Sequence, residues 1–155
     1  MAISVGAKAP GFELESTAGR LKLGGLGKRL VLYFYPKDDT PGCTREAQGF
    51  AALYEEFRAL GAEVWGVSKD SLASHARFQA KHALPFPLLS DPDNQVARAY
   101  GAFGTKKMYG KEVEGVIRST FVIGPDGQVE AVWSPVKVDG HAEEVLARVR
   151  ELAGR

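Results

Sequence analysis

Hydrophobic residues follow two different spacings along this chain. Residues 29–35 (RLVLYFY) are almost all apolar and end at Pro36, which is typical of a strand whose two faces are both covered. Residues 43–60 instead repeat apolar side chains every three or four positions, which predicts an amphipathic helix that ends at Gly61. The apolar face of this helix would consist of Ala47, Phe50, Ala51, Tyr54 and Phe57. A buried strand that leads into an amphipathic helix is typical of an α/β fold.

The remaining segments continue the alternation of strands and helices. Alternating stretches at residues 12–15 and 21–23 predict an N-terminal hairpin at one edge of the sheet, and Pro87 indicates an edge or chain-end position for its own strand. The other predicted elements are strands at 63–68, 86–89, 116–123 and 128–133, helices at 71–82, 91–100 and 140–153, and a surface loop at 101–115. This order predicts the α/β class, with a central mixed β-sheet flanked by helices in one domain spanning residues 1–155.

The single cysteine of the chain, Cys43, falls where the buried strand gives way to the helix. Thr40 is the expected N-cap, with a hydroxyl that can accept from a first-turn N–H, and Pro41 suits the next position because its missing N–H would have had no partner. Cys43 is then the third residue of the helix, where unpaired N–H groups and the helix dipole favour an anion. A free cysteine is often only a small buried hydrophobe, but this setting predicts a thiolate and hence a nucleophile.

Composition narrows the possible functions. Lys and Arg number 20 against 19 Asp and Glu, and no basic run is longer than Lys106–Lys107, so a nucleic-acid partner is not expected. No apolar stretch approaches the ~20 residues that a membrane-spanning helix needs, and the first residues lack the pattern of a signal peptide. One cysteine cannot form an internal disulfide, so a reducing cytoplasm is the expected location.

Three segments, taken in order, resemble those of one known family. Residues 35–44 (YPKDDTPGCT) match the Pro-x-x-x-Thr-x-x-Cys signature of the peroxiredoxins. Residues 106–111 (KKMYGK) and 118–123 (RSTFVI) resemble the typical loop and the arginine strand of its bacterioferritin comigratory protein, or Q-type, branch. The resemblance extends over nearly the whole chain. It implies a thioredoxin-like fold with an N-terminal β-hairpin extension, and a thiol-dependent peroxidase that reduces hydrogen peroxide and organic hydroperoxides without a metal or an organic cofactor.

The resemblance also implies roles for five residues. Cys43 is the nucleophile whose thiolate becomes a sulfenic acid, and Thr40 and Arg118 offer hydrogen bonds to the sulfur and to the peroxide oxygens. Pro36 shields the sulfur from water, and Glu46 orients Arg118. Each role has an ordinary alternative: Thr40 could only cap the helix, Arg118 could be a surface arginine, and Glu46 a solvated helix carboxylate. Burying Arg118 in an apolar strand without a partner would be costly, which favours its role in the site.

One position departs from the family pattern. Many Q-type members carry a resolving cysteine five residues after the first, and here that residue is Gln48. The chain therefore resembles a one-cysteine member, a monomer or a homodimer. The sulfenic acid would be reduced by an external thiol, such as thioredoxin, glutaredoxin or a low-molecular-weight thiol, or would pair with Cys43 of a second subunit.

Two alternative functions use the same cysteine. A redox-sensing module would react once at Cys43 rather than turn over. A thioredoxin-type disulfide reductase is disfavoured because residues 43–46 (CTRE) lack the second cysteine that such exchange uses.

Other segments of the sequence only partly match known binding motifs. The glycine-rich segment 24–29 (GGLGKR) lacks both the first glycine and the Ser/Thr of a phosphate loop, and residues 91–96 place a valine where a calcium loop requires glycine. His75, His82 and His141 show no pair at i, i+4 spacing, so no metal site is expected.

Overall fold

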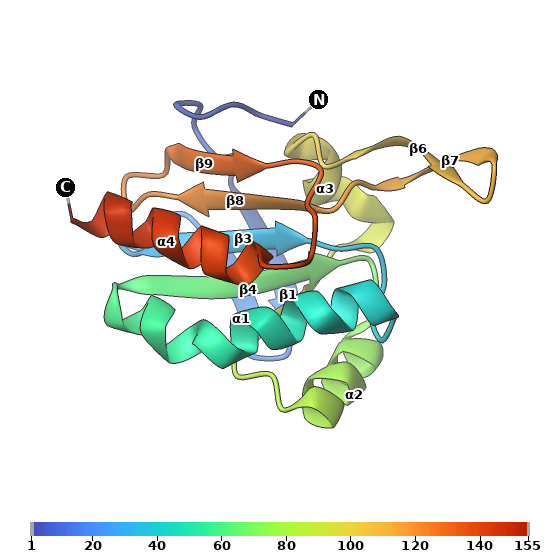
Figure 1. Ribbon diagram of the computed structural model, residues 1–155, viewed down its shortest axis with the longest axis horizontal. Helices are drawn as coiled ribbons and strands as arrows, with labels where there is room; N and C mark the ends of the chain where they lie inside the picture. The colour runs from blue at the N-terminus through green and yellow to red at the C-terminus, as the bar shows by residue number, and fades with distance from the viewer. Residues whose placement is uncertain (1, 155) are drawn as a thin grey trace.

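A seven-stranded mixed sheet forms the centre of the computed structural model, which describes residues 2–154 (Figure 1). Its strands are β1 (Phe12–Ser16), β2 (Gly19–Leu23), β3 (Arg29–Phe34), β4 (Ala62–Ser68), β5 (Leu88–Ser90), β8 (Ser119–Ile123) and β9 (Val129–Trp133). Their order across the sheet is β2-β1-β5-β4-β3-β8-β9. Strands β3, β4 and β5 are parallel, and β8 is antiparallel to β3. The predicted mixed sheet and the N-terminal hairpin, with β2 at the edge, are confirmed.

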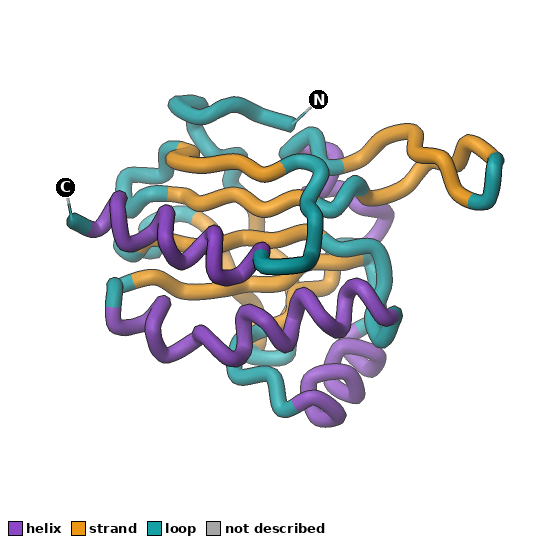
Figure 2. The backbone as a smooth tube through the Cα atoms, viewed as in Figure 1, coloured by secondary structure: helices purple, strands orange, loops and turns teal. Residues whose placement is uncertain are grey.

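Helices cover both faces of this sheet (Figure 2), which is why β3 is apolar and buried after its first residue, Arg29. Val31 and Tyr33 pack into the core beneath α1 and α4, whereas Leu30 and Leu32 pack into the core on the opposite face, with α3. The helices are α1 (Pro41–Ala59), α2 (Leu72–His82), α3 (Gln95–Ala99), which follows the 3-10 turn η1 (Pro92–Asn94), and α4 (His141–Ala153). Among the described residues, no helix has the length and apolarity that crossing a membrane requires.

Three expectations about the strands are wrong. The predicted loop at 101–115 is mostly a hairpin of β6 (Phe103–Met108) and β7 (Lys111–Val116), which projects beyond the sheet (Figure 1). One cross-strand pair of opposite charge, Lys107 with Glu112, favours this register where the sequence shows no apolar alternation. The predicted strand 116–123 is split between β7 and β8, so Arg118 lies in the short connection between them.

The third error concerns Pro87, which does not mark an edge strand. Strand β5 begins one residue after it and lies inside the sheet between β1 and β4. The missing N–H of Pro87 does no harm there because only its carbonyl is used, as an acceptor from the backbone N–H of Gly66 at 3.2 Å.

Candidate active site

Several chain segments that are distant in the sequence meet at the end of the sheet where strands β3 and β4 finish. Strands β3 and β4 are parallel, so the segments that follow them, residues 35–40 and 69–71, leave the sheet at the same end. Strand β8 begins there, because Ser119 pairs with Phe34 at the end of β3. This register places Arg118 beside the start of α1, and the candidate active site lies here.

Cys43 is the third residue of α1, as predicted from the Thr40–Pro41 pair. The residue is 1% exposed, and its Sγ lies 3.2 Å from Nη2 of Arg118, which donates to it. A Cβ atom at Gly42 would lie 3.3 Å from the same Nη2, so the absence of a side chain there lets the guanidinium approach the helix. The positive end of α1 and the Arg118 cation therefore act on the same sulfur.

Arg118 is held between Cys43 and Glu46. Its Nη1 donates to Oε1 of Glu46 at 2.7 Å, and the side chains of Arg118 and Glu46 are 18% and 1% exposed. Burial acts to lower the pKa of Arg118, but the Glu46 carboxylate and Cys43 outweigh it and raise that pKa. The solvated-carboxylate alternative for Glu46 is wrong, and the contact has the geometry that its predicted orienting role requires.

The Glu46 carboxyl is in an unusual electrostatic setting. Its Oε2 is buried and makes no hydrogen bond with the described residues. Burial raises the pKa of Glu46 to about 7, although the Arg118 cation opposes the rise. The carboxyl group therefore titrates close to neutral pH, while its hydrogen bond to Arg118 persists in either form because a neutral carboxyl still offers an acceptor oxygen.

This titration makes Glu46→Gln a test of the buried carboxyl. A folded-state pKa above the unfolded value of 4.5 means that the folded state keeps a proton that the unfolded state releases. As pH rises from below 4.5 through about 7, the free energy of unfolding of the parent protein should fall by roughly 3 kcal/mol in total. Glu46→Gln should not show this fall, because its amide does not titrate. Urea unfolding of both proteins between about pH 5 and about pH 8 should show the variant gaining relative stability. Parallel pH curves would contradict a buried, titrating Glu46.

Thr40 and Pro36 both lie in the segment before α1, and each has a predicted role in the site. Thr40 occupies the N-cap position with an extended backbone, but its hydroxyl caps no helix N–H. The hydroxyl instead donates to the carbonyl of Lys37 at 2.9 Å, so the predicted side-chain cap is wrong and the loop before α1 is closed on itself. Pro36 is half-buried directly after Tyr35, and its shielding of Cys43 stays a prediction.

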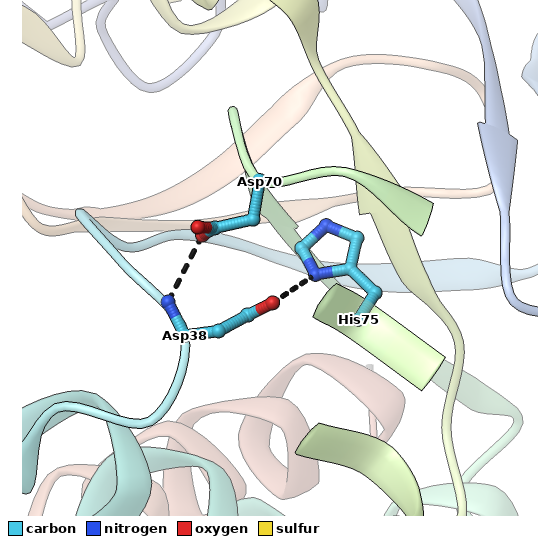
Figure 3. Close-up of side chains that lie close together, drawn as sticks. All are labelled: Asp38, Asp70 and His75. Atoms are coloured by element: carbon cyan, nitrogen blue, oxygen red, sulfur yellow. Dashed lines mark hydrogen bonds and ion pairs between the residues drawn. The ribbon is translucent and has the colours of Figure 1, made fainter. Parts of the chain in front are cut away.

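A second polar cluster, which no sequence pattern predicts, joins the loop before α1 to α2 (Figure 3). Asp38, in the loop before α1, points its carboxylate at Nδ1 of His75 on α2, at 2.7 Å, and its backbone N–H donates to Asp70 at 2.9 Å. Asp38 lies within the matched signature, and His75 falls one turn before Phe78 on the buried face of its helix. These two positions are the only hints of the cluster in the sequence, and no sequence pattern indicates that Asp38 and His75 are in contact.

The three side chains of this cluster are close enough to consider a metal ion. One potential ligand atom from each of Asp38, Asp70 and His75 lies within 4.8 Å of the others. The potential ligand oxygens already accept hydrogen bonds, however. Asp70 Oδ2 accepts from the hydroxyl of Ser68 at 2.5 Å and from the backbone N–H of Asp38, and Asp38 Oδ2 accepts from Ser74 at 2.8 Å. A metal would have to displace this set of hydrogen bonds, so the cluster fits a hydrogen-bonded network better than a metal site.

Comparisons with known proteins identify the family of the chain. A model of the AhpC/TSA family matches residues 5–132. A putative peroxiredoxin, Bcp, from Coxiella burnetii is 50% identical over 151 residues, covering 96% of this chain and all of its own length. A solved structure of the Xanthomonas campestris bacterioferritin comigratory protein, in work on its alkyl peroxide reduction activity, has a TM-score of 0.86 at 47% identity and covers 92% of each chain. A Xylella fastidiosa PrxQ mutant has a TM-score of 0.92 at 39% identity and covers 99% of each chain.

The chain belongs to the AhpC/TSA family. Its fold is the thioredoxin-like fold of the solved peroxiredoxins. Within the family it is a peroxiredoxin of the Bcp or Q type with a single cysteine, and therefore a thiol-dependent peroxidase.

Proposed function

We propose that Cys43 is the peroxide-reacting nucleophile, and that it reduces hydrogen peroxide and organic hydroperoxides in a one-cysteine cycle. The observation that carries the proposal is the placement of the Cys43 sulfur, in the first turn of α1 and 3.2 Å from the Arg118 guanidinium. Both neighbours stabilise a thiolate, and Arg118 has further N–H groups for an incoming oxygen. The Xanthomonas campestris relative, studied for alkyl peroxide reduction, supports organic hydroperoxides as one substrate class.

The reaction needs few steps from these residues. The Cys43 thiolate attacks one peroxide oxygen, an S–O bond forms, and the O–O bond breaks with both of its electrons going to the leaving oxygen. Arg118, fixed by Glu46, stabilises the charge that develops on that oxygen, which leaves as water or an alcohol after taking a proton from solvent. In this scheme the Thr40 hydroxyl is the second donor toward the peroxide, which requires that it rotate away from Lys37. Pro36 limits the access of water.

The second half of the cycle needs a thiol from outside the chain. An external thiolate attacks the sulfur of the Cys43 sulfenic acid and forms a mixed disulfide, and the expelled hydroxide takes a proton from solvent and leaves as water. A second thiol then attacks the mixed disulfide, which frees Cys43 and releases the disulfide of the reductant. Thioredoxin, glutaredoxin and low-molecular-weight thiols all fit this scheme, in a protein that is a monomer or a homodimer. A reducing cytoplasm is the location that suits such a cycle.

A turnover experiment tests the proposal against the redox-sensor alternative. Purified protein is given hydrogen peroxide or cumene hydroperoxide with each thiol supply in turn, and peroxide loss is followed. We expect many peroxide molecules consumed per protein. When thiol is withheld, peptide mass spectrometry should place the first added oxygen on Cys43. Consumption of only one equivalent under every thiol supply would favour a sensor, and an oxygen placed elsewhere would contradict the role of Cys43.

The absence of a resolving cysteine has a measurable consequence. Without thiol, excess peroxide should drive Cys43 to sulfinic and sulfonic acid, and activity should not return on later addition of dithiothreitol. Gln48→Cys should instead form an intramolecular disulfide and resist this inactivation. Mass spectrometry separates the outcomes, because the parent gains oxygen atoms and the variant loses two hydrogens.

The structure sets a condition on that disulfide. Residues 43 and 48 belong to the same continuous helix, where five residues rise by about 7.5 Å, beyond the ~7 Å limit between Cα atoms of a disulfide. The first turns of α1 must therefore unwind before the bond can form. Gln48→Ser is the matched control and should be inactivated like the parent. A Gln48→Cys protein that overoxidises at the parental rate would contradict this unwinding.

A further inference from the structure

The loop that leads into α1 is tied to α2 by Asp38. The Asp38 carboxylate is 4% exposed, accepts from the hydroxyls of Tyr35 at 2.6 Å and Ser74 at 2.8 Å, and lies 2.7 Å from Nδ1 of His75 (Figure 3). Its backbone N–H donates to Asp70 at 2.9 Å. Both the side chain and the backbone N–H of Asp38 are therefore held in place. The contacts come from residues at the ends of β3 and β4 and from α2.

The hydrogen bonds of His75 engage both of its ring nitrogens. Its side chain is fully buried, its Nε2 lies 2.9 Å from the Leu89 carbonyl, and its Nδ1 faces Oδ2 of Asp38. A carbonyl can only accept, so Nε2 carries a hydrogen. Burial acts to raise the pKa of Asp38, but its contacts with His75, Tyr35 and Ser74 together outweigh burial and lower that pKa, so this group is a carboxylate. Nδ1 and Oδ2 of Asp38 therefore share a hydrogen across 2.7 Å, in the geometry of a buried ion pair.

The loop that this pair holds bears directly on the reactive end of α1. Asp39, next to Asp38, has a left-handed backbone with φ of 59°, an unfavourable conformation for a residue with a side chain. Thr40 follows, bonded to the carbonyl of Lys37, and Pro41 begins the helix that carries Cys43. Release of Asp38 would free this strained segment to relax, and the start of α1 would move with it.

We propose that His75 is a positioning residue of the peroxidase: through its buried ion pair with Asp38 it holds residues 36–40, and with them the first turn of α1, in the peroxide-reducing arrangement. The inference rests on the proposed role of Cys43 as the nucleophile. His75 touches neither substrate nor sulfur, and it acts through the loop. A held loop keeps Cys43 closed, since this residue is only 1% exposed, whereas a released loop opens it to larger reagents.

Nuclear magnetic resonance of the reduced parent protein tests the ion pair without reference to activity. Histidine labelled with nitrogen-15 gives three ring systems in this chain, from His75, His82 and His141, and His75→Asn assigns the relevant one by its loss. We expect both ring nitrogens of His75 to carry hydrogen at neutral pH. A neutral ring, with one unprotonated nitrogen, would overturn the ion pair.

Kinetics then test positioning. In His75→Asn we expect the second-order rate of Cys43 with peroxide to fall by about fivefold or more, because displacement of reacting groups by even ~1 Å is costly. The rate of Cys43 with the bulky reagent dithionitrobenzoate should rise by a similar factor. The control is Val149→Ala, at a buried position of α4 that is outside the Asp38 cluster, which should shift neither rate beyond about twofold.

The outcomes separate this proposal from the proposed function. If peroxide fails to oxidise Cys43 in the parent, the proposed function is wrong, whatever the resonance experiment shows. If the parent reacts and His75→Asn changes the two rates no more than Val149→Ala does, His75 only adds stability and the positioning role is wrong. Saturable Zn²⁺ binding by the parent that is lost in His75→Asn would also overturn it in favour of a metal site. Should His75→Asn not fold, Ser74→Ala removes one contact of Asp38 and should shift both rates in the same directions by less.

Discussion

Replacing Cys43 with serine is expected to abolish peroxide reduction, with a loss of about 1,000-fold or more in the rate of peroxide consumption. The serine hydroxyl stays protonated near neutral pH, and neither the helix terminus nor Arg118 can make it a thiolate-like nucleophile. No other cysteine can take over, because the chain has one. The measurement is steady-state consumption of hydrogen peroxide with a non-limiting thiol supply.

A control separates loss of chemistry from loss of structure. Cys43 is buried, and serine differs from it by one atom, so Cys43→Ser should unfold in urea cooperatively and close to the parental midpoint. Thr44→Ser, on the next residue of the same helix turn, should retain activity and serves as the matched substitution. If folded Cys43→Ser kept a tenth or more of the parental rate, the nucleophile would have to be another group.

The local part of this site follows from sequence patterns alone. The apolar run before Pro36 predicts a strand, and the pair Thr40–Pro41 predicts the start of a helix within one residue of where it begins. These signals act over a few residues, so they place Cys43 in the first turn without knowledge of the tertiary structure. They do not predict what the Thr40 hydroxyl bonds to, because that depends on a loop conformation that only the complete fold determines.

The distant partners of the site could not be derived in this way. Arg118 lies 75 residues after Cys43, and only its resemblance to a family strand brought it into consideration. The structure gives the physical reason for their contact: β8 runs antiparallel to β3 in a register that pairs Ser119 with Phe34. Sheet register depends on long-range pairing, which local periodicity does not encode.

The contact between His75 and Asp38 could not be predicted from local sequence patterns either. The sequence position of His75 shows only that it lacks metal-ligand spacing, and it does not predict the burial of His75 on α2. Its partner Asp38 is 37 residues away, and the contact depends on α2 packing beside the loop that follows β3. A histidine that looks structural in the sequence can therefore influence the reactive end of α1 through one carboxylate.

Replacing Arg118 with methionine is expected to lower the second-order rate of peroxide reduction by at least about tenfold. Methionine keeps much of the side-chain volume but removes the cation next to the Cys43 sulfur and the N–H groups that would stabilise the leaving oxygen. The rate of Cys43 alkylation by iodoacetamide at neutral pH should fall as well, because less of the sulfur is present as thiolate. Arg118→Lys should lie between the two proteins, since it keeps a charge but not the planar fork that bonds Cys43 and Glu46 together.

The control for this prediction removes a different arginine from the same region. Arg45 lies on α1 two residues after Cys43, with its side chain 59% exposed and paired with Asp139. Arg45→Met deletes the same charge on the solvent side and should change peroxide reduction by less than about twofold, because exposed ion pairs contribute little. Fold retention in each variant is checked by urea unfolding. Equal losses in Arg118→Met and Arg45→Met would mean that overall positive charge, rather than the hydrogen bond from Arg118 to the sulfur, accelerates the reaction. An unchanged peroxide rate and alkylation rate in folded Arg118→Met would remove Arg118 from the site.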